Sequence, residues 1–306
     1  VDAARVEMKA AVSSRENGEL TAVFTICDAA GRTVDSRKVA VAAKLIGDSQ
    51  VSASFEMSNP HLWGGVGDPY LYTAAIELRS GRRVLDRVET CFGVRWFELD
   101  PDKGFFLNGL PYALRGTSIH QDMDGKATAL CAEDYERDYG FVKELGCNFV
   151  RLAHYPHNDI AFDICDRLGL IVQTEIPWVN VCGVEARPEY FANLHEQMGE
   201  MVRNLYNHPS IVFWGMWNEL AGWGNRPSLQ GRLDAAKVVE VTASLYDLAK
   251  SIDPQRLVGI TDCQLLNEDG YPGLKTDYVS ENRYNGFAMS TLAQLASHAA
   301  GALEVL

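Results

Sequence analysis

Hydrophobic and polar residues alternate along the first hundred residues of the chain. The stretch Val6–Val12 alternates, and Leu20–Ile26 repeats the pattern before the polar turn Asp28–Gly31. A period of two is typical of strands that bury one face, and short strands separated by turns indicate an antiparallel sandwich. The predicted strands are Val6–Val12, Leu20–Ile26, Val34–Val41, Val51–Phe55, Leu71–Leu78 and Val84–Phe92.

The pattern changes near Asp100–Gly104. Beyond it, short and nearly all apolar segments alternate with amphipathic segments of helical period, which indicates a parallel sheet covered by helices. The predicted strands are Tyr112–Gly116, Asn148–Leu152, Leu170–Glu175, Ile211–Trp217, Leu257–Thr261 and Asp277–Arg283. The predicted helices are Ala132–Leu145, Asn158–Leu168, Glu189–Tyr206, Leu233–Ile252 and Ser290–Leu306.

These segments make about six β/α units, whereas a closed (β/α)8 TIM barrel needs eight. We therefore predict a multidomain chain with a β-sandwich over residues 1–98. A TIM-barrel domain, truncated after about six units, follows over residues 99–306. The first and sixth barrel strands would have free edges, so we expect either a homo-oligomer or dependence on the missing segment.

Polar and aromatic residues gather where the predicted barrel strands end, and the strand interiors lack them. Because barrel active sites lie at the carboxyl ends of the strands, this distribution predicts a functional site there. In chain order the residues are His120, Asp122, Arg151, His154, Glu175, Trp178, Asn218, Glu219, Asp262, Asn282 and Tyr284.

Two of these residues, Glu175 and Glu219, are carboxylates that end neighbouring strands. Carboxylate pairs are typical of glycoside hydrolysis, in which one carboxyl group must hold a proton near neutral pH. An apolar wall raises a carboxyl pKa because it penalises the charged form. Trp178, Trp214 and Trp217 could provide that wall, although the mid-strand position of Trp214 also fits a core residue.

Several of these residues also have a purely structural interpretation. Glu175 could form an ion pair with Arg151 that holds the barrel mouth together. His120 and His154 could be hydrogen-bonded core histidines, and Tyr284 could be a packing residue.

Composition narrows the function classes. The chain has 28 basic and 41 acidic residues, a net charge of −13, so a nucleic-acid partner is not expected. Seven scattered cysteines without a CxxC pair argue against a zinc site or a disulfide framework. No apolar run reaches membrane-spanning length and no signal peptide is visible, so we expect a soluble protein with no membrane partner.

A series of motifs, in order, resembles glycoside hydrolase family 2. The resemblance covers nearly the whole chain, including an immunoglobulin-like sandwich before the barrel. The motifs are Pro60–Trp63, Pro69–Tyr72, Phe92–Arg95, Gly104–Gly109, Leu114–Gly116 with His120–Asp122, Asn148–Pro156, Cys165–Gly169, Glu175–Pro177, Asn207–Ile211 and Trp217–Glu219.

This resemblance implies a retaining β-glycosidase acting on a carbohydrate substrate. The runs Arg151–Tyr155 and Trp214–Leu220 look most like bacterial β-galactosidases, with β-glucuronidase and β-mannosidase as alternatives within the family. By the same resemblance Glu219 is the general acid/base and Asn218 contacts the sugar. The pocket would also be lined by His120, Asp122, Arg151, His154, Glu175, Trp178, Asn282 and Tyr284.

The chain departs from the family pattern in three places. The family's second glutamate, the nucleophile, has no counterpart, since Glu281 belongs to the sixth strand and Glu304 to the terminal helix. The family's amino-terminal sugar-binding domain is also missing. Pro177 stands where some members carry a magnesium-binding histidine, so no metal or other cofactor is expected.

These departures indicate a fragment that alone shows little or no turnover. A non-catalytic carbohydrate-binding protein is the alternative from another class. The sequence does not choose between the cytoplasm and the periplasm of a bacterium.

Overall fold

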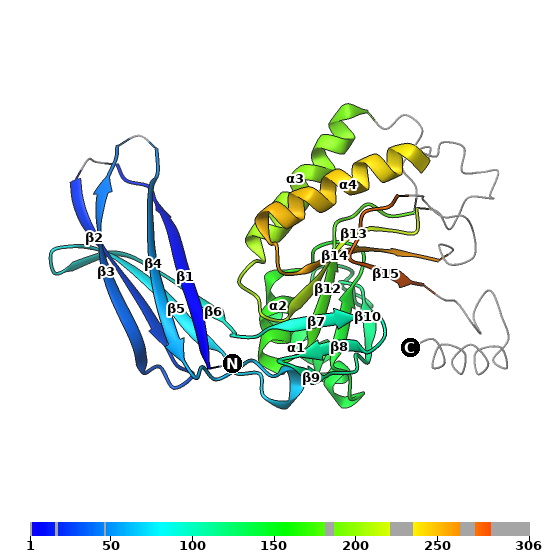
Figure 1. The fold of residues 1–306 in the computed structure, drawn as a ribbon, viewed down its shortest axis with the longest axis horizontal. Helices are drawn as coiled ribbons and strands as arrows, with labels where there is room; N and C mark the ends of the chain where they lie inside the picture. The colour runs from blue at the N-terminus through cyan, green and yellow to red at the C-terminus, as the bar shows by residue number, and fades with distance from the viewer. Residues whose placement is uncertain are drawn as a thin grey trace.

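The computed structural model describes residues 2–15, 18–45, 47–180, 187–220, 235–263 and 273–282. Figure 1 shows a β-sandwich on one side and a helix-covered parallel sheet on the other. This arrangement confirms the predicted sandwich followed by a β/α-barrel domain. None of the helices in the described ranges is long and apolar enough to cross a membrane.

The sandwich consists of a two-stranded and a four-stranded antiparallel sheet. The small sheet pairs β1 (Ala3–Val12) with β4 (Ser49–Ser58). The large sheet has, in order, β3 (Thr33–Ala43), β2 (Gly18–Cys27), β5 (Tyr72–Ser80) and β6 (Arg83–Phe92). Strand β4 buries every second residue, as the alternating sequence predicts, and Phe24, Ile26 and Phe55 fill the space between the sheets.

A small antiparallel sheet, which the sequence pattern did not predict, follows the sandwich. It consists of β7 (Phe97–Asp100), β8 (Gly104–Leu107) and β9 (Leu110–Pro111). Phe105 and Leu107 share a buried cluster with Ile171 and Val212, which begin barrel strands. The small sheet therefore packs against the amino ends of the barrel strands, opposite the predicted site.

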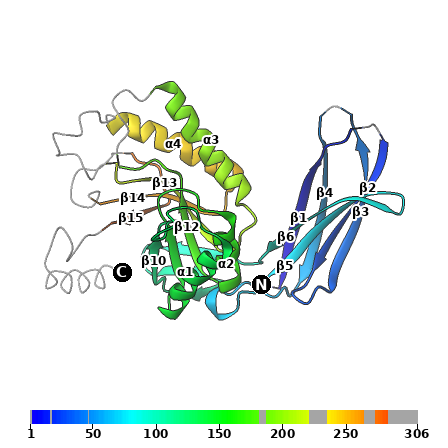
Figure 2. The same ribbon diagram turned by 180° about the vertical axis from the view of Figure 1, so that it is seen from behind.

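The barrel domain contains six parallel strands in sequence order. The strands are β10 (Gly116–Ile119), β11 (Phe149–Leu152), β12 (Ile171–Glu175), β13 (Ile211–Asn218), β14 (Leu257–Asp262) and β15 (Tyr278–Glu281). The helices are α1 (Ala132–Glu144), α2 (Asp159–Leu168), α3 (Pro188–Asn204) and α4 (Ala235–Ile252). Figures 1 and 2 show α3 and α4 side by side on the outer face of this sheet.

One predicted barrel strand was misplaced. The first strand begins at Gly116, where the predicted Tyr112–Gly116 segment ends. Residues 110 and 111 belong instead to β9, because their apolar character serves the small sheet. The predicted helix over 290–306 and Tyr284 lie outside the described residues.

Local signals position the helices that carry the strands. Helix α2 begins after Asn158, whose side chain accepts a hydrogen bond from Ile160 N (3.0 Å), and ends at Gly169 with φ 76°. A Cβ atom at Gly169 would lie 2.1 Å from Gly65 O, so the sharp stop also permits a close backbone approach. Pro188 starts α3, a position where its missing N–H costs nothing.

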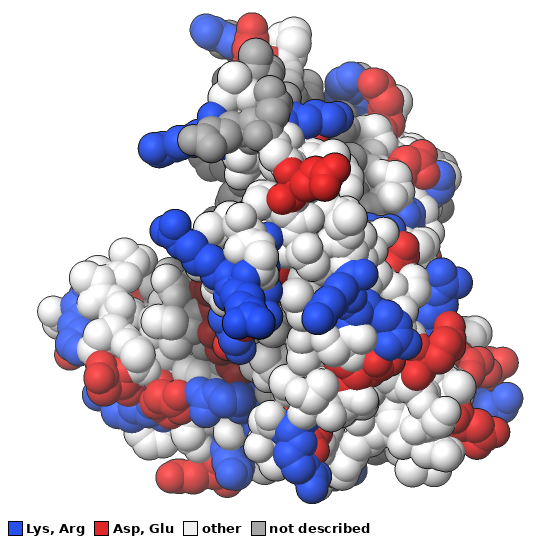
Figure 3. Space-filling view, turned by 90° about the vertical axis from the view of Figure 1, so that its left-hand side faces the viewer, with Lys and Arg blue, Asp and Glu red and all other residues white. Residues whose placement is uncertain are grey.

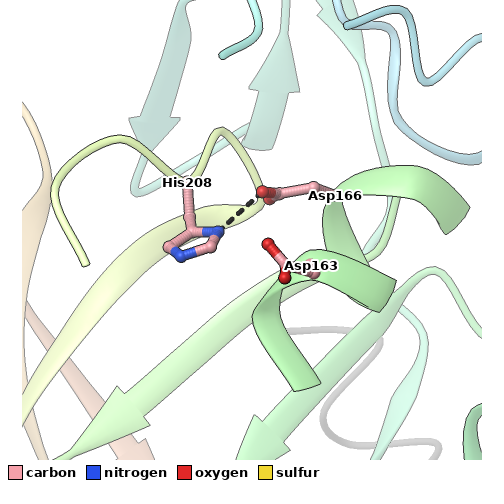
Figure 4. Close-up of side chains that lie close together, drawn as sticks. All are labelled: Asp163, Asp166 and His208. Carbon is pink, nitrogen blue, oxygen red and sulfur yellow. Dashed lines mark hydrogen bonds and ion pairs between the residues drawn. The ribbon is translucent and has the colours of Figure 1, made fainter. Parts of the chain in front are cut away.

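A polar cluster joins α2 to the loop before β13 and to the sandwich end of the chain. Asp166 accepts hydrogen bonds from Ser210 N (3.0 Å) and His208 Nδ1 (2.7 Å), and Trp63 Nε1 donates to its carbonyl (2.9 Å). Figure 4 shows Asp163 turned toward the same pair. Burial alone would lower the pKa of His208, but Asp166 and then Asp163 outweigh it and raise that pKa.

Candidate active site

The predicted site is centred on a buried ion pair between two strand ends. Glu175 ends β12 and Arg151 lies in β11; their side chains form a salt bridge through Arg151 Nε, and Arg151 Nη2 lies 3.1 Å from Glu175 Oε2. His154 Nδ1 lies 3.0 Å from the same oxygen. Burial raises the pKa of Glu175, but His154 and Arg151 outweigh it and hold the pKa below its ordinary value. Glu175 is therefore an ionised partner of Arg151.

The close approach of two strands makes this ion pair fit. A Cβ atom at Gly215, the neighbour of Glu175 across the β12–β13 ladder, would lie 2.5 Å from Glu175 Cγ. Glycine at this position therefore provides the space that the glutamate side chain occupies. Sequence reasoning did not single out Gly215, because its role depends on the strand register.

Arg151 continues the network to the next strands. Its Nη2 donates to Asn218 Oδ1 (2.7 Å), and its Nη1 donates to Asn282 Oδ1 (2.8 Å). The Asn282 amide in turn donates to Asn218 Oδ1 (3.0 Å) and to Glu219 Oε1 (2.6 Å). Three strand ends are thus joined through side chains that sequence reasoning selected separately.

Glu219 follows β13 and is held in an unusual backbone conformation. Its φ is +55°, a region that residues other than glycine adopt rarely, and its N–H donates to Thr261 O (2.8 Å) in the neighbouring strand. The residue is 2% exposed. Its position is therefore fixed by main-chain and side-chain contacts together, as a reacting group requires.

Two further residues support the network and were missed from the sequence. Gln173, inside β12, donates to Glu175 Oε1 (2.9 Å) and to Thr261 Oγ1 (3.1 Å). The Ser280 hydroxyl lies 3.3 Å from Gln173 Oε1. A polar residue within an otherwise apolar strand was the available signal, since a buried amide requires partners.

The first strand contributes an aromatic group at the edge of the network. The ring of His120 lies 5.3 Å from that of His154 and 6.3 Å from that of Tyr155. His120 and Asp122 are exposed, whereas Arg151 and Glu175 are buried. The first-strand residues therefore lie toward solvent, above the ion pair.

The predicted tryptophan wall is wrong for the described structure. Trp178, Trp214 and Trp217 are all fully buried in the barrel core. The Trp217 indole donates to Thr242 in α4 (3.0 Å), and the Trp214 indole donates to Asp253 just after it (3.1 Å). These rings pack between sheet and helix, because a strand covered on both faces directs large side chains outward as well as inward.

Trp178 needs a separate correction because it was predicted to bind substrate. Its segment runs beside β13, and Asn218 N donates to Trp178 O (2.9 Å). That pairing directs the ring into the core. Glu175 likewise lies beneath the mouth, 1% exposed, and supports the pocket through Arg151.

Comparison with known proteins decides the family. Residues 99–285 match the profile of the glycosyl hydrolases family 2 TIM barrel domain, and residues 1–95 match a second glycosyl hydrolases family 2 profile. The chain belongs to glycoside hydrolase family 2.

Relatives within family 2 have two activities in their names. The chain is 36% identical to a β-glucuronidase of Bacteroides fragilis over 246 residues, 79% of this chain and 33% of that protein. It is 30% identical to a β-galactosidase of Bacteroides ovatus over 230 residues, 74% of this chain and 27% of that protein. The chain therefore spans about a third of the length of these family 2 relatives.

A solved family 2 structure has the same fold over nearly the whole chain. A putative β-galactosidase from Bacteroides fragilis superposes with a TM-score of 0.85 at 31% identity, covering 97% of this chain and 43% of that one. A Parabacteroides merdae β-glucuronidase also gives 0.85 at 26% identity, covering 99% and 37%. Sandwich and barrel thus occur together in longer family 2 proteins.

Proposed function

We propose that this chain carries the acid/base part of the active site of a retaining β-glycosidase, with Glu219 as the reacting group. The supporting observation is the geometry of Glu219, which ends a barrel strand with its carboxylate 2.6 Å from the Asn282 amide. Its backbone is fixed by the bond to Thr261. A group held in this way can transfer a proton without first being ordered.

In the proposed reaction Glu219 protonates the glycosidic oxygen as the bond to the leaving group breaks. It then takes a proton from the water that attacks the glycosyl-enzyme intermediate. Asn218 is the proposed contact to a sugar hydroxyl beside the scissile bond. Arg151 orients it, because the guanidinium holds Asn218 Oδ1 and leaves the amide NH2 to face outward.

Glu175 is not proposed as the nucleophile. Its carboxylate is engaged by Arg151, His154 and Gln173, and it is almost fully buried. In a retaining enzyme the nucleophile and the acid/base lie about 5–5.5 Å apart on either side of the anomeric carbon. We assign the nucleophile to another glutamate, supplied by the longer protein.

Two sugars are candidates. The run Arg151–Tyr155 resembles bacterial β-galactosidases, whereas several relatives, including the Bacteroides fragilis protein, are named β-glucuronidase. A glucuronide carries a carboxylate, which requires a cation or several donors in the pocket. Arg151 is already paired with Glu175, so a glucuronidase would need that donor from outside the described residues.

The test compares hydrolysis of aryl β-galactoside and aryl β-glucuronide by the full-length protein and its Glu219→Gln variant. Loss of the general acid should reduce kcat by about 10²- to 10⁴-fold. Glu196→Gln, an exposed glutamate on α3, is the matched control and should leave kcat unchanged. Equal rates for wild type and Glu219→Gln would refute the assignment, and the ratio of kcat/KM for the two substrates identifies the sugar.

The 306-residue chain should show little or no turnover on its own. Titration calorimetry with galactosides then separates the enzyme part from a carbohydrate-binding protein. If the full-length protein binds a galactoside but never hydrolyses an aryl glycoside, the binding function replaces the enzymatic one.

A further inference from the structure

The sandwich has an open cleft along one side, away from the proposed active site. Its volume is about 740 Å³, and strands β1 and β6 flank it. The barrel side contributes Tyr206, Pro209 and Arg256 at one end.

The way each strand lines the cleft shows which of its surfaces faces the space. Strands β2 and β5 contribute alternate residues, Ala22 and then Ala74, Ile76 and Leu78, which is the pattern of an exposed sheet face. Strand β1 contributes the consecutive run 6–13, and β6 the run 86–90. Consecutive residues can line one space only when the strand edge, with its main-chain groups, borders it. The cleft therefore has an apolar floor and two strand edges as walls.

Both walls have free main-chain hydrogen-bonding groups. In the described part of the chain β1 pairs with β4 alone, and β6 pairs with β5 alone. Their second edges face the cleft. Unpaired strand edges are sites where a further strand adds by main-chain hydrogen bonds.

The inward face of β6 is also uncovered. Val88 lies opposite Ile76 in the β5–β6 ladder, so its side chain is on the interior face, yet it is 63% exposed. On β4, by contrast, the inward residues Val51, Ala53 and Phe55 are all buried. A sandwich normally buries such positions against an opposing strand.

Charge argues against a small ionic ligand in the cleft. Lys9 pairs with Glu7 (3.2 Å), and Arg87 pairs with Glu77 (2.6 Å) and with Glu89. Figure 3, which views the molecule from the sandwich side, shows basic and acidic groups interspersed over the surface. With the charges near the cleft paired to one another, the apolar floor and the main-chain edges are what the cleft offers.

We propose that the cleft binds an extended polypeptide segment as a seventh strand, and that this segment belongs to the same natural protein outside these 306 residues. Its inward side chains would be apolar and pack on Ala74, Ile76 and Leu78, and its main chain would bond to the free edges of β1 and β6. The length of the relatives favours this occupant, since the chain spans about a third of them. A segment of the same chain also has a high effective concentration at the cleft.

Hydrogen exchange measured by mass spectrometry tests the proposal, which does not depend on the glycosidase assignment. The 306-residue chain is compared with the full-length natural protein. Edge amides of β1 and β6 should exchange at least about tenfold more slowly in the full-length protein, while β2 amides should exchange alike in both. Equal, fast exchange at these edges in both proteins would overturn the proposal.

A pair of substitutions provides a second readout. Val88→Lys should lower the melting temperature of the full-length protein by about 5 °C, because it puts a charge under the added strand, and leave the 306-residue chain within about 1 °C. Val34→Lys is the matched control, since Val34 is a 47% exposed sandwich valine away from the cleft. Equal shifts for Val88→Lys in both proteins would contradict the added strand.

The oligomeric state separates the remaining occupant. Slow exchange at β6 in the 306-residue chain, together with a concentration-dependent dimer mass, would show that a second copy fills the cleft. That result would overturn the assignment to a segment of the same chain.

Discussion

Strands β4 and β13 bury their side chains in opposite ways. In β4 every second residue is buried, from Ser49 to Met57. In β13 all eight residues, Ile211–Asn218, are buried. A sandwich strand has one face toward the core and one toward water, whereas a barrel strand has helices on one face and the barrel interior on the other. The difference explains why polar chemistry is concentrated in the barrel.

A polar residue in the two regions has different surroundings. On β4 it turns to solvent and needs no partner. Within the barrel it is enclosed and must be paired, as Gln173 is with Glu175 and Thr261. The candidate site is therefore a continuous hydrogen-bonded network, and its members are sensitive to one another.

The largest expected effect on stability is in this network. Arg151→Met should destabilise the chain by about 3–5 kcal/mol, because it leaves the buried Glu175 carboxylate without its cation. Arg37→Met, which removes an exposed ion pair with Asp35 on β3, is the control and should cost less than about 1 kcal/mol. Urea denaturation measures both, and similar values would mean that burial does not distinguish the two pairs.

Adjacent substitutions test the strand contrast itself. In β13 both Met216→Ala and Trp217→Ala should cost about 2–5 kcal/mol, because both side chains are fully buried. In β4 Phe55→Ala should cost about as much, while its exposed neighbour Glu56→Ala should stay within about 0.5 kcal/mol. A large effect at Glu56, or a negligible one at either β13 position, would contradict the burial pattern.

The smallest expected effect is pH-dependent and lies at the junction between the regions. The pKa of His208 is raised above its ordinary 6.5, so protonated His208 stabilises the folded state. That contribution, about 1 kcal/mol, is fully present below pH 6.5 and is lost as pH rises through the higher folded pKa. His208→Gln should therefore flatten the dependence of unfolding free energy on pH across this window. An unchanged pH profile in the variant would show that another group is responsible.

Glu175 has the opposite sign. Its folded pKa is lowered, so its contribution is present above its ordinary value of 4.5 and is lost as pH falls through the folded pKa. Acid denaturation of Glu175→Gln should accordingly begin from a lower stability and show a shallower fall below pH 4.5. A parallel acid transition in wild type and variant would rule out this ion pair as the source.

Much of the fold was predictable because it depends on local periodicity. The alternating strands and the β/α succession followed from the spacing of apolar residues, and Gly169 and Pro188 marked helix boundaries. The first barrel strand was misplaced because apolar residues near 110 serve the small sheet at the barrel base instead. Periodicity alone does not say which sheet an apolar segment joins.

The sequence by itself determined the family, the order of sandwich and barrel, and the strand ends where polar groups gather. Only the tertiary structure decided how those groups interact: that Glu175 pairs with Arg151, that Asn282 reaches Glu219, and that Trp178 turns into the core. It also disclosed the open side of the sandwich. The physical reason is that pairing and burial depend on strand register and on contacts between residues far apart in the chain, which no local pattern records.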